Sequence, residues 1–121
     1  MATKLDAPPN DWRASVPRYS AENLTKNHKI SNIMAELAAK YDSTPAQLAL
    51  AWLFAKAEEL GATVIPIPGT TKVHNALYNM KATAINFSDP EDMKTLESLA
   101  DLVAGARGTE AYMKMSLEGQ K

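Results

Sequence analysis

The sequence predicts a mostly helical α/β fold with one clear parallel strand, for three reasons. Between residues 44 and 80 the expected elements run helix, loop, strand, loop, helix, which is the alternation of α/β proteins. Residues 62–67 are a nearly continuous apolar run, as in a parallel strand buried on both faces. A loop rich in threonine follows this strand and leads into the next helix.

Length and composition indicate one domain without nucleic-acid, membrane or metal partners. The chain has 121 residues, 45% of them apolar, and a formal net charge of -1, so it offers no basic field to nucleic acid or to a membrane surface. It has no cysteine, and its two histidines lack the spacing of metal ligands. No apolar run approaches the ~20 residues that span a bilayer, and the N-terminus lacks a signal-peptide centre. We therefore expect a cytoplasmic protein.

The N-terminal segment, residues 1–20, is expected to be an irregular loop, with the domain formed by residues 21–121. Prolines occur three times within "DAPPNDWRASVPRYS", and proline both lacks an amide hydrogen and disfavours helix in the residue before it. Trp12 and Tyr19 are the expected anchors of this loop.

A first helix is predicted from residue 21 to about residue 41, with Ser20 as its N-cap. Its apolar residues recur at steps of three and four and form one stripe. The members of that stripe are Ile30, Ile33, Met34, Leu37, Ala38 and Tyr41.

A second helix is predicted over residues 44–60 by clear end signals. Thr44 and Gln47 have the spacing of a capping box, and Pro45 suits the first helical position. Gly61 stands where a left-handed residue ends a helix. Because this helix is apolar almost all round, we expect it to be covered on most sides.

Two further helices and a short tail are expected. Val73, Ala76, Leu77 and Met80 indicate a short helix. Residues 88–103 indicate another, with a capping box from Ser88 to Glu91, Pro90 in the first turn and Gly105 beyond the end. The tail over residues 109–117 is expected to add a turn or two of helix. The methionines expected in the core are Met34, Met80 and Met93.

The single predicted strand needs hydrogen-bonding neighbours that this sequence does not supply. Backbone donors and acceptors of a buried strand must be paired on both sides. Either the chain is a piece of a larger α/β protein, or the strand pairs with another chain. The alternative is that residues 63–67 are an apolar connector within a helical bundle.

The loop after the strand, Gly69, Thr70, Thr71 and Lys72, has the composition of an anion site. Backbone amides at a helix start are unpaired and carry partial positive charge. The glycine permits close approach, the threonines add hydroxyl groups and the lysine adds a full charge. The alternative is a tight turn with a threonine N-cap and a solvated lysine.

Two stretches, "PNDWRASVPRYSAENLTKN" and "TPAQLALAWLFAKAEELGATVIPIPGTTKVHNALYNM", resemble the C-terminal part of aldo-keto reductases. The resemblance runs from about Asp11 to Met115 and is greatest to the group with "IPGT" followed by threonine and a basic residue. It implies the C-terminal portion of a (β/α)₈ TIM barrel that uses NADPH to reduce aldehydes and ketones. Residues 63–67 would be the eighth strand, preceded by the two long helices.

The resemblance also implies a cofactor site around the loop. Carried over position by position, the phosphate-binding turn falls on Gly69, Thr70, Thr71 and Lys72. Asn79 falls on the asparagine that meets adenine. Asn75 stands in the same site, where many members have an arginine, and Tyr78 stands where glutamate or glutamine is usual. An asparagine cannot make the charged, bidentate contact of arginine.

No catalytic residue is expected in this chain. The family reacts through an aspartate, a tyrosine, a lysine and a histidine from its early strands and loops, and no residue here matches them. His28 is expected on the surface, and His74, in the first turn of the helix after the loop, is expected to be exposed to solvent rather than to face a phosphate. We expect the C-terminal part of an NADP(H)-dependent reductase, inactive alone, whose complete barrel would bind NADPH and a small carbonyl substrate. The alternative is a non-catalytic interaction module that self-associates through the unpaired strand.

Overall fold

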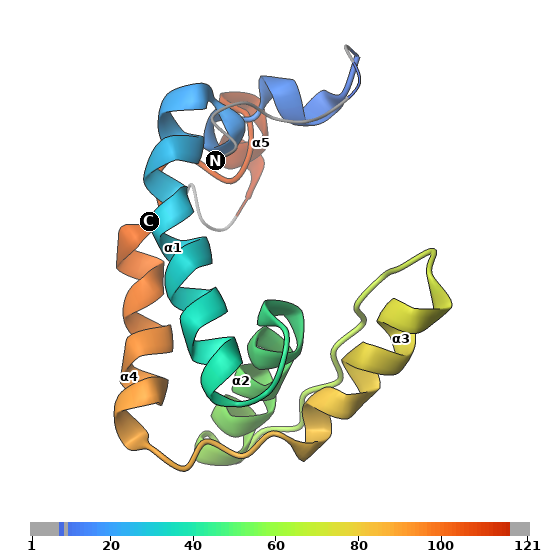
Figure 1. The fold of residues 1–121 in the computed structure, drawn as a ribbon. Coiled ribbons are helices and arrows are strands. Elements are labelled where there is room, and N and C mark those ends of the chain that lie inside the picture. The colour runs from blue at the N-terminus through green and yellow to red at the C-terminus, as the bar shows by residue number, and fades with distance from the viewer. Residues whose placement is uncertain (1–7, 9, 117–121) are drawn as a thin grey trace. The chain divides into compact units, whose positions relative to one another are not determined.

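The structure is a computed structural model that describes residues 8 and 10–116. Its α-helices are α1 (Ala21–Lys40), α2 (Pro45–Glu59), α3 (Val73–Met80), α4 (Pro90–Ser98) and α5 (Glu110–Met115), as drawn in Figure 1. Its 3₁₀ helices are η1 (Trp12–Ser15), η2 (Pro17–Tyr19), η3 (Lys81–Ala84) and η4 (Leu99–Leu102). The chain forms two compact units: residues 31–100 make the central unit, and the described residues before and after them make the terminal unit. None of the helices in the described part of the chain combines the length and apolar character needed to cross a bilayer.

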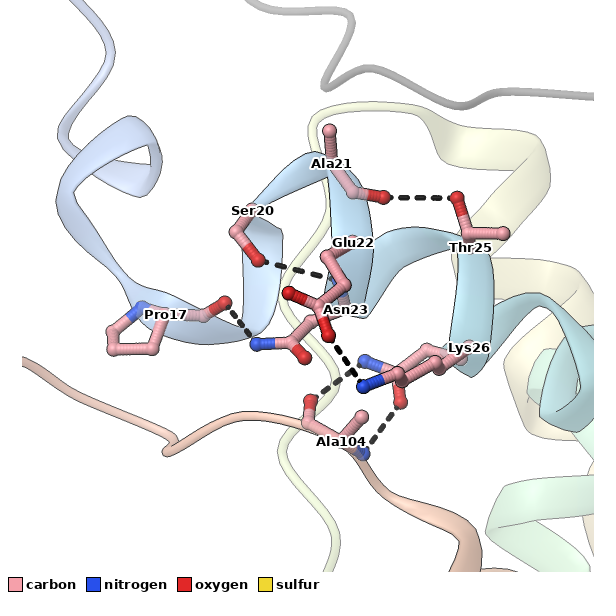
Figure 2. Close-up of polar contacts among 9 residues, drawn as sticks. Pro17, Ser20, Ala21, Glu22, Asn23, Thr25, Lys26 and Ala104 are labelled. Carbon is pink, nitrogen blue, oxygen red and sulfur yellow. Dashed lines mark hydrogen bonds and ion pairs between the residues drawn. The ribbon is translucent and has the colours of Figure 1, made fainter.

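The terminal unit is held together by backbone-directed polar contacts between segments far apart in sequence. Asn27 of α1 contacts the backbone of Ala104, and Arg18 Nε donates to the carbonyl of Gly105 at 3.4 Å. The Asn23 side chain donates to the carbonyl of Pro17 at 2.9 Å (Figure 2). Val16 is the buried apolar residue of this unit among those described.

Helix α1 begins where the sequence predicts. The Ser20 hydroxyl accepts a hydrogen bond from the backbone N–H of Asn23 at 3.2 Å, which is the contact of an N-cap (Figure 2). The proline-rich segment before it forms the two short helices η1 and η2 in its described part, where Asp11 caps η1 through the N–H of Arg13. Trp12 is exposed and does not anchor this segment by burial, contrary to expectation, whereas Tyr19 is half-buried.

Helix α2 forms the core of the central unit, and its start confirms the predicted capping box. The Thr44 hydroxyl accepts from the N–H of Gln47, and the Gln47 side chain accepts from the N–H of Thr44. Leu48 is fully buried, and the helix ends before Gly61, whose φ of 61° is the predicted left-handed conformation. One stripe of α2 is buried, whereas its other residues are half-buried or exposed, so the helix is less covered than expected.

The strand predicted at residues 62–67 is wrong for this structure. Residues 62–70 carry no regular secondary structure and run as an extended connection from α2 to α3 (Figure 1). Val64 and Pro66 are half-buried, whereas Ile65 and Ile67 are 81% and 92% exposed, so side chains alternate as they do in a strand. The physical reason is the lack of a neighbour: a strand exists only through ladder hydrogen bonds, and the described residues supply no partner.

Helix α4 differs from its prediction in its N-cap. Asp89, rather than Ser88, caps the helix by accepting from the N–H of Glu91 at 3.0 Å, while Pro90 occupies the first turn as expected. A carboxylate at this position is also favoured by the helix dipole. The regular helix ends at Ser98 and continues as η4, short of Gly105.

The methionine predictions are mixed, and the short tail helix forms. Met34 and Met93 are half-buried, but Met80, at the end of α3, is exposed. Thr109 caps α5 through the N–H of Tyr112. Residue 117, the expected end of the tail, lies outside the described residues.

Candidate functional site

The candidate site is a hollow of about 600 Å³ in the central unit. One side is formed by the first turns of α2, and the other by the loop after residue 67 and by α3. The residues that line it are Thr44, Ala46, Ala49, Leu50, Leu53, Pro68, Gly69, Thr70, His74, Asn75, Tyr78 and Asn79. The hollow therefore has an apolar side from one helix and a polar side from another.

The α2 side is shaped by small residues at helical spacing. Ala46, Ala49, Leu50 and Leu53 are three or four positions apart and share a face of α2. Alanine at two of these positions leaves room between α2 and the loop. The sequence alone does not indicate that this side belongs to the site, because the spacing of its residues is that of any helix face.

The loop is ordered by Thr70. Its hydroxyl accepts from the backbone N–H of Lys72 at 3.1 Å and from Asn75 Nδ2 at 3.4 Å. These two hydrogen bonds form a local turn that fixes the backbone conformation of the loop just before α3. Gly69 has a φ outside the left-handed region, and a Cβ added to it would meet no atom within 4 Å. The glycine is thus not required by the turn, and its surroundings are open.

The start of α3 presents unpaired backbone donors. Its first intrahelical hydrogen bond runs from the N–H of Ala76 to the carbonyl of Lys72 at 3.3 Å, and Lys72 caps the helix without a side-chain bond. The N–H groups of residues 73–75 therefore have no intrahelical partner. Thr71 and Lys72 are exposed beside these groups, and no described carboxylate lies within ion-pair distance of the lysine.

Four of the six residues predicted for cofactor binding line this hollow together: Gly69, Thr70, Asn75 and Asn79. The other two, Thr71 and Lys72, adjoin it in the loop but do not line it. Tyr78 also lines the hollow, at the position where the resemblance implies an acidic residue or its amide. His74 is exposed, as predicted, and contributes to the lining.

Comparisons with protein-family models and with curated proteins agree on one family. The model of the Aldo/keto reductase family matches residues 2–101. The chain belongs to the aldo/keto reductase family. It is also 39% identical over 102 residues to "Probable aldo-keto reductase 1" of Glycine max, an alignment that covers 83% of this chain and 28% of that protein. No solved structure matches the chain.

Membership in the aldo/keto reductase family gives the fold in outline. The family is one of (β/α)₈ barrels, and this aldo/keto reductase chain corresponds to part of one, spanning about 28% of the length of the curated relative it matches. The helices of the structure are the helical component of that α/β fold.

Two titratable side chains contribute to the lining of the hollow in this aldo/keto reductase chain. His74 and Tyr78, both on α3, are the titratable side chains of its lining. Among the described residues, no group of three or more histidine and carboxylate side chains is placed to hold a metal ion.

His28, expected on the surface, is half-buried in α1, and its Nδ1 atom is buried without a hydrogen-bond partner among the described residues. The histidine lies in the terminal unit, whereas the hollow belongs to the central unit.

A second hollow, of about 380 Å³, lies within the terminal unit. Its lining residues are Trp12, Ser15, Val16, Arg107, Gly108, Thr109 and Tyr112. The sequence alone does not reveal this hollow, because its two contributing segments are more than 90 positions apart. Each segment contains one aromatic residue, Trp12 or Tyr112, and this was the sequence feature that could have suggested a shared site.

Proposed function

We propose that this chain is the C-terminal part of an NADP(H)-dependent aldo-keto reductase that reduces aldehydes or ketones in the cytoplasm, and that it holds the adenosine 2′-phosphate end of the cofactor. The observation that carries the proposal is the shared hollow: Gly69, Thr70, Asn75 and Asn79 line one space together with an apolar face of α2. Family membership supports the reaction class.

The chemistry of the donor set fits a phosphate. Unpaired N–H groups at the start of α3, the Thr71 hydroxyl and the Lys72 ammonium lie in consecutive residues. Backbone donors at a helix N-terminus and a nearby cation are a recurrent combination at phosphate sites. The openness around Gly69 leaves room for such a group to approach the backbone.

The size and lining of the hollow fit the adenosine moiety. A volume of about 600 Å³ lies within the range of ligand pockets. Asn75 and Asn79 supply amide donors and acceptors, and α2 supplies an apolar surface. Amide side chains are well suited to the polar edge of adenine.

The role of the chain in the reaction would be to bind and orient. The nicotinamide cofactor, when bound, supplies the hydride that reduces the carbonyl group. We propose that Lys72, Thr71 and the start of α3 retain the 2′-phosphate, whereas no side chain of the hollow transfers a proton to substrate. Accordingly we propose that the chain is inactive alone and acts within a complete barrel with a small carbonyl substrate.

Titration of NADPH into the chain tests the proposal, with the fluorescence of Trp12 and Trp52 as the readout. Saturable binding is expected for the wild type, and Lys72→Ala should weaken it about tenfold or more through loss of the charged phosphate contact. Lys29→Ala, which removes an exposed lysine of α1 from outside the hollow, is the matched control and should bind as the wild type does. No saturation at millimolar NADPH, or equal affinities for all three proteins, would reject the proposal.

The exposed isoleucines of residues 63–67 support a second candidate function, that of an interaction module. Ile65 and Ile67 present apolar side chains on one side of an extended segment that has no ladder partner among the described residues. Such a segment is a template for pairing with another strand. We propose that self-association of the chain proceeds through it when no barrel partner is present.

Light scattering during gel filtration tests this second candidate. The wild type should elute as a dimer or larger, and the double variant Ile65→Lys/Ile67→Lys should shift to the monomer, because charged edge residues oppose pairing. Val73→Lys, at another exposed apolar position outside the segment, is the control. A wild type that is monomeric across the micromolar range would exclude the candidate.

A further inference from the structure

Tyr78 is the aromatic residue of the hollow and has no assigned role. Its side chain is 48% exposed, and it lines both the main hollow and a neighbouring one of about 460 Å³ formed by α3 and Lys81. The ring therefore separates two open spaces instead of packing into a core. An aromatic ring left half-exposed inside a concave site is available to a flat ligand.

One face of the ring is already occupied by a cation. Lys81 Nζ lies over the Tyr78 ring, 5.3 Å from its centroid, which is the geometry of a cation–π contact. The two residues are three positions apart at the end of α3, so helix geometry maintains the pair. Lys81 lines only the neighbouring hollow, whereas Tyr78 lines both, so the contact with Lys81 restrains the ring without placing Lys81 in the lining of the main hollow.

Polar groups beside the ring suit the edge of a purine. Asn75 and Asn79 are three positions before and one position after Tyr78, and both line the same hollow. Asn75 Nδ2 donates to the Thr70 hydroxyl at 3.4 Å, so the side-chain Oδ1 of Asn75 is the atom that can accept a hydrogen bond from a ligand. The lining also includes Ala49 and Leu53 of α2, which offer apolar contact to a ring system.

We infer that Tyr78 is a base-stacking residue that gives this site its affinity for an adenine ring. The inference rests on the proposed cofactor function and deepens it. It assigns part of the binding free energy to the contact with the base, in addition to the contacts with the phosphate. Because Asn75 cannot make the charged, bidentate phosphate contact of an arginine, the stacked tyrosine would be the main determinant of adenosine binding in this chain. Stacking of a base on an aromatic side chain accounts for roughly 5- to 150-fold in affinity.

Calorimetric titration with 2′,5′-ADP, which carries the base and the 2′-phosphate without nicotinamide, tests the inference. Tyr78→Ala should weaken binding about tenfold or more, and Tyr78→Phe should retain it, since the ring and not the hydroxyl makes the contact. Tyr112→Ala is the matched control, because Tyr112 is also 48% exposed but lies in the other unit. Unchanged circular dichroism spectra would establish that the variants are folded.

The proton NMR spectrum of the ligand gives a readout that a structural role would not move. Stacking should shift the adenine H2 and H8 resonances upfield in the wild type and in Tyr78→Phe, and these shifts should vanish in Tyr78→Leu, which keeps an apolar side chain without a ring. Wild-type binding that is unaffected by Tyr78→Ala, or upfield shifts that persist in Tyr78→Leu, would overturn the inference and leave the cofactor function standing. No binding of 2′,5′-ADP by the wild type would overturn both.

Discussion

Asn27 pairs with both backbone groups of Ala104. Its Nδ2 donates to the Ala104 carbonyl at 3.0 Å, and its Oδ1 accepts from the Ala104 N–H at 2.8 Å. The side chain thereby substitutes for a strand neighbour and ties residue 104 to α1 within one unit, 77 positions away. Such double pairing satisfies a donor and an acceptor that would otherwise be left partly buried.

Removal of this pairing should destabilise the terminal unit. We expect Asn27→Ala to cost about 1–3 kcal/mol, because two part-buried backbone groups lose their partners. Asn27→Asp should cost a similar amount, since it keeps the acceptor but loses the donor. Urea denaturation measures both. Asn86→Ala is the control, because Asn86 is exposed and bonds only the nearby Ala84 carbonyl; equal costs at the two positions would contradict the prediction.

A methyl group at Gly105 should be poorly tolerated. Gly105 has a φ of 86°, and a Cβ there would lie 2.5 Å from Asn23 Nδ2 and 2.8 Å from Arg18 Cα. We expect Gly105→Ala to cost roughly 3 kcal/mol from combined backbone strain and overpacking. Gly61→Ala isolates the strain, since Gly61 has a φ of 61° and open space around it, and should cost roughly 1 kcal/mol. Thermal unfolding compares the two; an equal loss would show that the contacts at Gly105 are unimportant.

The ion pairs between α1 and α4 should make stability depend on pH in the acid range. Lys40 Nζ lies 2.7 Å from Asp92 Oδ2 and 3.1 Å from Asp89 Oδ2. The Lys40 contact, followed by the hydrogen bond from the Tyr41 hydroxyl, lowers the pKa of Asp92. The N–H of Glu91, followed by Lys40, lowers the pKa of Asp89. As the pH falls, these two carboxylates therefore bind protons in the unfolded chain before they do so in the folded chain. The stabilisation is present above about pH 4, and it is lost as the pH falls through the lowered pKa values of the folded state.

Asp92→Asn tests this assignment, because it removes the charge at the more buried of the two carboxylates. Unfolding free energy measured between pH 5 and pH 2 should fall less steeply in this variant than in the wild type. Asp101→Asn, at an exposed aspartate without an ion pair among the described residues, should keep the wild-type slope. Identical slopes in all three proteins would remove Asp92 from the explanation.

Thr70 should order the loop, and Thr71 should not. Thr70→Val removes the acceptor for the N–H of Lys72 and for Asn75 Nδ2, so the Lys72 amide should exchange its hydrogen faster. Thr71→Val is matched in chemistry and position, and the described residues provide no hydrogen-bond partner for Thr71. It should leave the exchange rate of Lys72 unchanged. Amide hydrogen exchange followed by NMR compares the variants, and an equal effect at both positions would be evidence against the role of Thr70.

The helix ends could be predicted from sequence where local chemistry decides them. Thr44, Gln47 and Gly61 carry their signals within a few positions, and the structure confirms α2 and its caps. Ser88 and Asp89 are adjacent, and both have capping side chains. The choice of Asp89 depends in part on Lys40, which is 49 positions away and joins it only in the folded unit. Local pattern could not supply that contact.

The strand and the second side of the hollow depend on partners rather than on local pattern. The residues around Ile65 have the composition and the alternating exposure of a strand, but strand formation is a property of two segments, and no second segment lies among the described residues. For the hollow, the loop residues were identifiable from their donor chemistry. The α2 side, from Ala46 to Leu53, was not, because its alanines become part of a site only when α3 folds back beside them.

Mapping the binding of 2′,5′-ADP on the backbone amides by heteronuclear NMR locates the adenosine-phosphate site on the chain. The expected result is a saturable set of shift changes confined to residues 69–79 and to the α2 side from residue 46 to 53, with the largest changes at Thr71, Lys72 and Val73. Changes that are absent at millimolar ligand, or that centre on the terminal unit around Trp12 and Tyr112, would contradict the proposed function.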